Sequence, residues 1–341
     1  MKKIKRDNLK SLYELISSNQ RLYIPCKKAE QTNYAIYTSD SEADLCTLKT
    51  TKSAKEIFFP QSETLYSVVK DGKKYSVAQQ ELENESFVLF GVRACDLRGI
   101  EVLDKVFLSE PVDTFYKARR DHGVIVTLCC NEPEESCFCT AFGIDPTAPK
   151  GDVEATFAGD YLYLDAKSEK GEKLIAELAE VLEDADEADV ADEKSNIAEI
   201  LKKLPYADLS LEGWNGSVTE EKFDSPIWDE LYKPCLACGT CTFVCPTCQC
   251  YDIKDYDTGK GVQRYRCWDS CMYSDFTMMA HGNNRTSQKQ RFRQRFMHKL
   301  VYFPANNDGM YSCVGCGRCV DKCPASTNIV KVIKAFSKEV K

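Results

Sequence analysis

Apolar residues recur with helical spacing near the start of the chain and then in short runs typical of β-strands. One helical face is predicted within residues 7–18, formed by Leu9, Leu12, Tyr13, Leu15 and Ile16. Short strands are predicted at residues 21–25, 34–38 and 56–59. Residues 65–69 and 75–77 flank Asp71-Gly72, which predicts a hairpin with a short turn.

The clearest pattern in the N-terminal half is strand–helix–strand. Residues 87–90 and 124–128 are short apolar runs suited to buried strands, and apolar positions within residues 97–107 recur with the period of a helix. This order favours a parallel strand pair joined by a right-handed crossover. A second hairpin is predicted from residues 153–157 and 161–164.

An acidic helical stretch separates this half from the rest of the chain. Residues 171–204 show helical spacing, and the acidic run 183–189 is expected to be a solvated helix end or linker. Pro205 ends the second helix of the stretch. We therefore expect an α+β protein with a mixed α/β domain over residues 1–205, containing a short parallel strand pair, and a mostly helical domain over residues 206–341.

The C-terminal part contains two cysteine runs with the same spacing, C-x₂-C-x₂-C-x₃-C-P. In two-cluster ferredoxins the fourth cysteine of each run binds the other cluster. The predicted ligands of one [4Fe–4S] cluster are Cys235, Cys238, Cys241 and Cys323. The predicted ligands of a second are Cys313, Cys316, Cys319 and Cys245. Structural zinc is the alternative, but zinc takes four sulfurs and has no use for a third C-x₂ step. The domain formed by residues 206–341 is thus expected to be ferredoxin-like.

Further cysteines follow the two predicted parallel strands. Cys95 follows the first strand, Cys129 and Cys130 follow the second, and Cys137 and Cys139 lie in the same loop. Ligands gather at the carboxyl ends of parallel strands. We therefore predict a third [4Fe–4S] cluster held by Cys95, Cys137, Cys139 and either Cys129 or Cys130. Buried free thiols are the alternative, and this is the interpretation we adopt for the isolated Cys26 and Cys46.

Residues 246–312 form an insert between the two runs. The insert carries Cys248, Cys250, Cys267 and Cys271, which either bind one more cluster or are structural. No acidic residue lies between Asp275 and Asp308, whereas six cations do: Arg285, Lys289, Arg291, Arg293, Arg295 and Lys299. Three interpretations are open for these cations. They form a solvated basic face, they dock an acidic partner, or they raise the reduction potential of a negatively charged cluster.

Composition narrows the class of protein. The chain has 341 residues, 19 cysteines and a formal net charge of −8, which argues against nucleic acid as a partner. Residues 1–19 lack the apolar segment of a signal peptide, and no apolar run approaches the roughly 20 residues of a membrane span. We expect a cytoplasmic protein of anaerobic metabolism whose cysteines are metal ligands.

Several motifs together resemble a known family. They are Phe90-Gly-Val-Arg-Ala-Cys-Asp-Leu-Arg-Gly-Ile, Cys130-x₆-Cys137-Phe-Cys139, Cys241-Thr-Phe-Val-Cys-Pro-Thr-Cys-Gln-Cys250, Trp268-Asp-Ser-Cys271, residues 291–299 and residues 313–319. Over residues 55–335 the chain resembles iron–sulfur subunits that include the beta subunit of soluble sulfhydrogenase and the corresponding subunit of anaerobic sulfite reductase. The resemblance selects Cys130 over Cys129 for the third site. It also matches Cys248, Cys250 and Cys271, but not Cys267.

The resemblance implies an electron-transfer subunit of a soluble multi-subunit oxidoreductase. Such a subunit relays single electrons between a flavin subunit that handles NAD(P)H and a catalytic subunit, such as a hydrogenase or a sulfur or sulfite reductase. The clusters carry the redox change, so no catalytic residue is predicted. The alternatives are a self-contained iron–sulfur reductase with its own substrate or flavin site, and a zinc-binding interaction protein. No G-x-G-x-x-G follows a strand, and His122, His281 and His298 form no metal or triad pattern.

Overall fold

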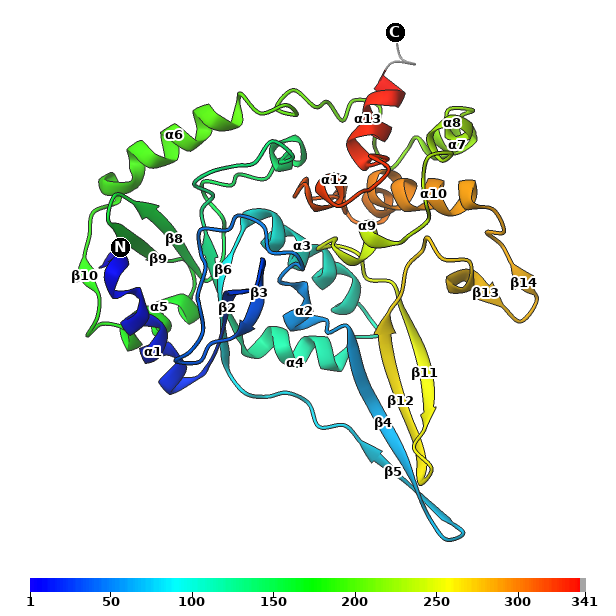
Figure 1. The fold of residues 1–341 in the computed structure, drawn as a ribbon, viewed down its shortest axis with the longest axis horizontal. Coiled ribbons are helices and arrows are strands. Elements are labelled where there is room, and N and C mark those ends of the chain that lie inside the picture. Colours follow the sequence, from blue (N-terminus) through cyan, green and yellow to red (C-terminus); the bar gives the residue numbers. More distant parts are fainter. Residues whose placement is uncertain (338–341) are drawn as a thin grey trace.

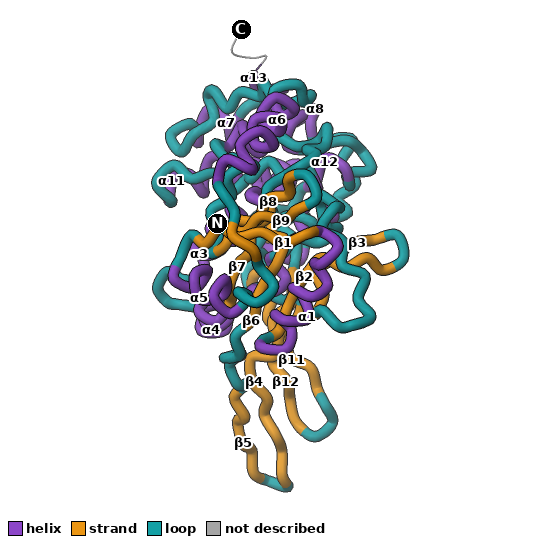
Figure 2. The backbone as a smooth tube through the Cα atoms, turned by 90° about the vertical axis from the view of Figure 1, so that its left-hand side faces the viewer, coloured by secondary structure: helices purple, strands orange, loops and turns teal. Residues whose placement is uncertain are grey.

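The computed structural model describes residues 1–337 and has three visible parts (Figure 1). A β-sheet body occupies the N-terminal half, a helical lobe carries the C-terminal residues, and a long β arm projects from the body. Figure 2 shows the arm pointing away from the end of the molecule that carries the helical lobe.

The body is an eight-stranded mixed sheet with the order β10-β1-β9-β8-β7-β6-β2-β3. Its strands are β1 (Lys2–Lys5), β2 (Arg21–Lys28), β3 (Gln31–Ile36), β6 (Phe87–Val92), β7 (Gly123–Leu128), β8 (Val153–Ala158), β9 (Tyr161–Ala166) and β10 (Glu183–Asp184). The pairs β2/β6, β6/β7 and β7/β8 are parallel, and the others are antiparallel. The predicted parallel pair is therefore confirmed, and it lies at the centre of a larger sheet.

Helices cover both faces of the central strands. Val88 and Phe90 pack in one core with α1 (Leu9–Asn19) and α5 (Glu169–Glu177), whereas Phe87 and Leu89 pack in another with α3 (Ala94–Phe107) and α4 (Thr114–His122). Because both faces are buried, β6 is a continuous apolar run.

Two local predictions need correction. The strand predicted at residues 56–59 is wrong, because Lys55–Phe58 forms the short helix α2. Phe58 and Phe59 are both fully buried, and a run this short does not reveal its period. The acidic run 183–189 is exposed as expected apart from the half-buried Ala185, but its first two residues form β10, an edge strand beside β1.

The helical lobe consists mainly of short helices around one aromatic core. They are α6 (Ala191–Leu201), which leads into the lobe, α7 (Thr219–Asp224), α8 (Trp228–Leu231), α9 (Thr240–Phe243), α10 (Gln288–Met297), α11 (Phe303–Asn306), α12 (Arg318–Asp321) and α13 (Ile329–Ser337). Trp214, Trp228, Phe292, Phe296 and Phe336 fill the core. Within residues 1–337, no helix is both long and apolar enough to cross a membrane.

The arm is a four-stranded antiparallel sheet with the order β11-β12-β4-β5. Strands β4 (Ser62–Asp71) and β5 (Lys74–Gln79) form the hairpin predicted in the N-terminal half. Strands β11 (Tyr251–Asp257) and β12 (Gly261–Trp268) come from the insert, and β12 pairs with β4. The sequence did not reveal this second hairpin, and its pairing with β4 joins segments on either side of residue 205.

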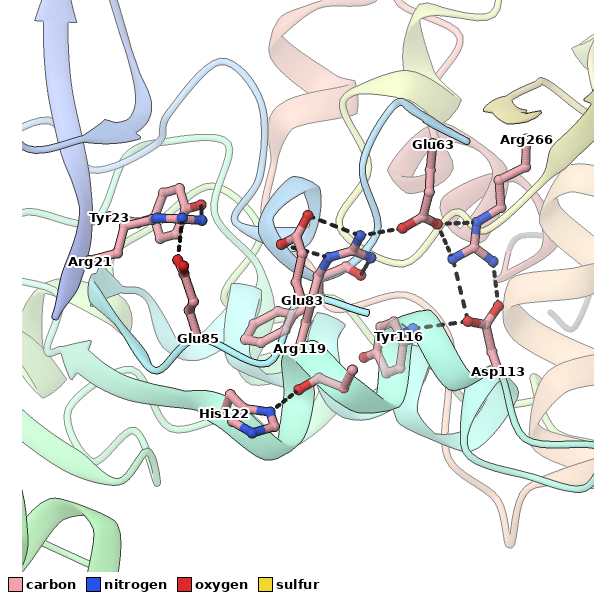
Figure 3. A network of polar contacts seen from close by, with 12 residues as sticks. Arg21, Tyr23, Glu63, Glu83, Glu85, Asp113, Tyr116, Arg119, His122 and Arg266 are labelled. Carbon is pink, nitrogen blue, oxygen red and sulfur yellow. Dashed lines mark hydrogen bonds and ion pairs between the residues drawn. The ribbon is translucent and has the colours of Figure 1, made fainter. Parts of the chain in front are cut away.

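A buried network of charges fixes the root of the arm (Figure 3). Glu63 of β4 accepts from Arg266 of β12 at 2.6 Å and from Arg119 of α4. Arg266 also pairs with Asp113, whose carboxylate caps α4 by accepting from the Tyr116 amide at 2.9 Å. Both arginines therefore have carboxylate partners within a buried site.

Candidate metal centres

The first cysteine set surrounds one cavity in the helical lobe. Cys235, Cys238 and Cys241 line it together with Cys323, which comes from the end of the other run. Cys238 is exposed and lies beside Gly239, whose φ of +75° favours glycine. A Cβ at Gly239 would also lie 2.8 Å from Cζ of Tyr273. The turn between these cysteines thus depends on a glycine.

The second cysteine set surrounds a neighbouring cavity. Cys313, Cys316 and Cys319 line it with Cys245, again the last cysteine of the other run. Cys313 and Cys316 are buried. The structure therefore brings together both sets of four that the crossed spacing predicted.

The third set lies at the carboxyl ends of β6 and β7. Cys95 is the second residue of α3, which follows β6, and Cys130 follows β7. The sulfur of Cys139 interacts electrostatically with those of Cys130 and Cys137, and Cys95 interacts with Cys139. These four cysteines thus meet at one edge of the sheet.

Cys129 makes different contacts. The Thr156 hydroxyl donates to the Cys129 sulfur at 3.0 Å, and this sulfur lies 3.2 Å from the Thr147 carbonyl oxygen. The choice of Cys130 over Cys129 is consistent with this placement. Cys26 is buried and Cys46 is exposed, and neither belongs to a cysteine-lined cavity described above.

The third and second sets are locked against each other. The Phe138 amide donates to the Gly315 carbonyl at 2.9 Å, and a Cβ at Gly315 would lie 2.4 Å from the Phe138 carbonyl oxygen. Arg318 donates to both carboxylate oxygens of Asp96, at 2.6 and 2.7 Å, and both side chains are buried. Asp96 follows Cys95 in α3 and Arg318 precedes Cys319 in α12, so this bidentate pair joins the two cysteine-bearing helices.

Burial disfavours the thiolate form of these cysteines. It raises the pKa of Cys241 and Cys316 to about 12 and that of Cys130 to about 11. Free thiols with such pKa values are protonated at neutral pH. Because iron–sulfur ligation takes the thiolate, binding must release protons.

The cysteines of the insert divide into two groups. Cys248, Cys250 and Cys271 lie near one another, and Cys250 and Cys271 are within hydrogen-bonding distance. Cys267 lies apart on β12, opposite Asp252, and its electrostatic neighbours are Lys254, Asp252 and Asp269 rather than those three cysteines. Among residues 1–337, no three His, Cys, Asp or Glu side chains form a group that holds a single metal ion.

Two cations of the basic stretch 285–299 are buried beside the first and second cysteine-lined cavities. Arg295 borders both the first and the second cavity, and Lys299 borders the second. Arg295 is 3% exposed and Lys299 is 4% exposed, so a solvated basic face is wrong for these two. Although burial disfavours its charge, the neighbouring sulfurs of Cys245 and Cys248 raise the pKa of Lys299. The sequence signal for this placement was their i, i+4 spacing next to Phe292 and Phe296.

Comparisons with known proteins agree with this arrangement of cysteines. Residues 234–327 match the family described as 4Fe-4S dicluster domain. Sulfhydrogenase 2 subunit beta of Pyrococcus furiosus is 31% identical over 318 residues, which cover 92% of this chain and 91% of that protein. The chain belongs to the sulfhydrogenase beta subunit family. No solved structure matches it.

Family membership confirms the resemblance to sulfhydrogenase beta subunits. Together with the dicluster match, it supports an iron–sulfur protein that binds 4Fe–4S clusters and transfers electrons. The predicted fold class is also confirmed, since a mixed α/β sheet precedes a C-terminal dicluster domain.

Proposed function

We propose that this chain is the electron-transfer subunit of a multi-subunit oxidoreductase and holds [4Fe–4S] clusters at three cysteine sets. The observation that carries the proposal is the crossed lining of two cavities. Each contains three cysteines of one run and the last cysteine of the other. This is the ligand pattern of two-cluster ferredoxins.

The three sets follow one another in space, which supports a linear relay. Cys139 of the third set packs with Cys316 of the second. Cys319 of the second set interacts electrostatically with Cys241 of the first. The exposed Cys238 places the first set near the surface, where a partner can exchange electrons with it.

Each bound cluster supplies a reversible one-electron redox change, and the protein sets its potential. The thiolates of the chain hold the iron, while Arg295 and Lys299 offset the negative charge of the ligand sets. Backbone amides contribute in the same direction: Ala237 N–H points to the Cys235 sulfur at 3.4 Å, and Thr327 N–H to the Cys323 sulfur at 3.2 Å. Nearby cations and N–H donors raise cluster potentials.

The relay requires a donor and an acceptor outside this chain. The similar protein from Pyrococcus furiosus is a subunit of a sulfhydrogenase, which supports a complex with other subunits. We infer that one partner is a flavin subunit handling NAD(P)H and the other a redox catalyst. A reducing cytoplasm suits the many free thiols of this chain.

Metal and flavin content of anaerobically purified protein tests the proposal. The three cubes of this proposal require at least about 12 iron atoms per chain with equal acid-labile sulfide, and we expect no flavin in the isolated chain. Bound FAD or FMN would instead favour the self-contained reductase. Zinc without acid-labile sulfide would overturn the proposal.

A further inference from the structure

Three cysteines of the insert meet where the arm joins the helical lobe. Cys250 lies within hydrogen-bonding distance of Cys271 and interacts electrostatically with Cys248. At either end of this group, Cys271 lies near Cys241 of the first set, and Cys248 lies near Cys245 of the second. The group is therefore adjacent to both ferredoxin-type sets.

The insert hairpin builds this group. Cys250 directly precedes β11, and Cys271 follows the end of β12 by three residues. Tyr251 pairs with Trp268 across the hairpin, and the Asp269 amide donates to the Cys250 carbonyl at 2.9 Å. Residues about twenty positions apart are thus brought together by the arm.

A buried lysine from the body faces the same group. Lys55 of α2 is 2% exposed, and its Nζ donates to the Cys248 carbonyl at 2.8 Å. The ammonium lies 4.0 Å from the centroid of the Trp268 ring. No carboxylate in the described part of the chain forms an ion pair with Lys55 or with Lys299, which also lies near Cys248. A buried lysine either loses its proton or needs negative charge beside it, so a charged Lys55 requires an anionic group at this site.

We propose that Cys248, Cys250 and Cys271 hold a fourth iron–sulfur cluster of the [4Fe–4S] class, with Lys55 as its counter-charge. The proposal rests on the proposed function, because Cys245 is assigned to the second set. Soft thiolates select zinc, copper(I) or iron–sulfur clusters. A closed structural zinc site takes four protein ligands, and only three cysteines remain here.

Binding at this site exchanges three thiol protons for three iron–sulfur bonds. The fourth iron then has no cysteine of this chain as its ligand, so it is open to water or to a small exogenous thiol. The site would thus be a branch of the relay beside the first and second sets. Cys267 has no part in it.

Iron content of the full-length chain distinguishes the outcomes. Because each cube holds four irons, we expect about 16 iron atoms in the unchanged protein and about 12 in Cys250→Ser or Cys271→Ser. Cys267→Ser is the matched control on the same hairpin and should retain about 16. About 12 irons in the unchanged protein would overturn the fourth cluster while leaving the proposed function intact. About 12 irons together with one zinc ion per chain would also overturn the fourth cluster. Unchanged protein that contains no iron would overturn both the fourth cluster and the proposed function.

The role of Lys55 has its own test. Lys55→Met should lower the reduction potential of the signal that Cys271→Ser removes, and Lys55→Arg should restore it. Lys52→Met, at the partly exposed Lys52 that pairs with Glu56, is the control. An EPR-monitored redox titration that shows the same potential in Lys55→Met and in unchanged protein would overturn the assignment of Lys55.

Discussion

Two regions of this molecule bury cations in opposite ways. At the root of the arm, Arg119 and Arg266 are paired with the carboxylate of Glu63 (Figure 3). In the cysteine-rich region, Arg295 and Lys299 are as deeply buried but form no ion pair with a carboxylate of the described residues. Arg295 Nε has no hydrogen-bond partner among the residues that the structure describes.

This difference in ion pairing indicates where the charge of a bound group would balance a buried cation. A buried ion pair is complete within the protein, and removing one of its partners is costly whether or not a cofactor is present. Buried cations that face thiols are compensated only when those sulfurs are charged. The first region is therefore structural, and the second is prepared for anionic groups.

The largest expected effect comes from breaking a cysteine set. Cys323→Ala should remove the cluster whose other ligands are Cys235, Cys238 and Cys241, because these four line one cavity. About four irons per chain should be lost, together with one EPR signal after reduction. Cys26→Ala, which changes a buried cysteine of the sheet body, is the control. Loss of only the cluster bound by the Cys313 run would show that the crossed ligation is wrong.

The next effect comes from breaking the paired region. Glu63→Gln leaves two buried arginines with one carboxylate less, which should cost about 3–5 kcal/mol of stability. Chemical unfolding should show a similar loss in iron-loaded and iron-free protein, since the network contains no cluster ligand. A loss of stability seen only in the iron-loaded protein would contradict a purely structural role for this network.

A smaller effect is expected from the unpaired cations. Arg295→Met should lower the potentials of both the first and the second cluster, because Arg295 borders both cavities. A shift of about 60 mV corresponds to a tenfold change in a one-electron equilibrium. Lys299→Met is the matched variant and should move the second potential but not the first. Equal shifts of both potentials in the two variants would contradict this assignment.

The smallest effect is expected at an exposed pair of the arm. Arg264 and Asp255 form a bidentate contact at 2.6 and 2.7 Å, but both side chains are exposed to solvent. Asp255→Asn should leave the unfolding midpoint and the iron content unchanged, because exposed ion pairs contribute little. A loss comparable to that of Glu63→Gln would show that burial does not decide the contribution of these pairs.

The sequence by itself determined the features that are local. Short turns in the repeated C-x₂-C-x₂-C-x₃-C-P spacing place three cysteines of each set close together, and the ferredoxin ligand pattern predicted the fourth from the other run. The run of residues 87–128 likewise predicted a parallel pair with cysteines at its carboxyl ends, and β6 and β7 have that arrangement.

Tertiary structure decided what depends on distant segments. The pairing of β12 with β4 joins residues about two hundred positions apart, and no periodicity within either strand encodes its partner. The fold also brings Lys55 to the Cys248 carbonyl and places Cys267 opposite Asp252 on β12. Burial of Arg295 and Lys299 also depends on the surrounding fold, because a cation-rich helix is expected to be solvated until its neighbours are known. The spacing of the cysteines thus identifies candidate ligands, whereas only the tertiary packing shows which cations lie beside them.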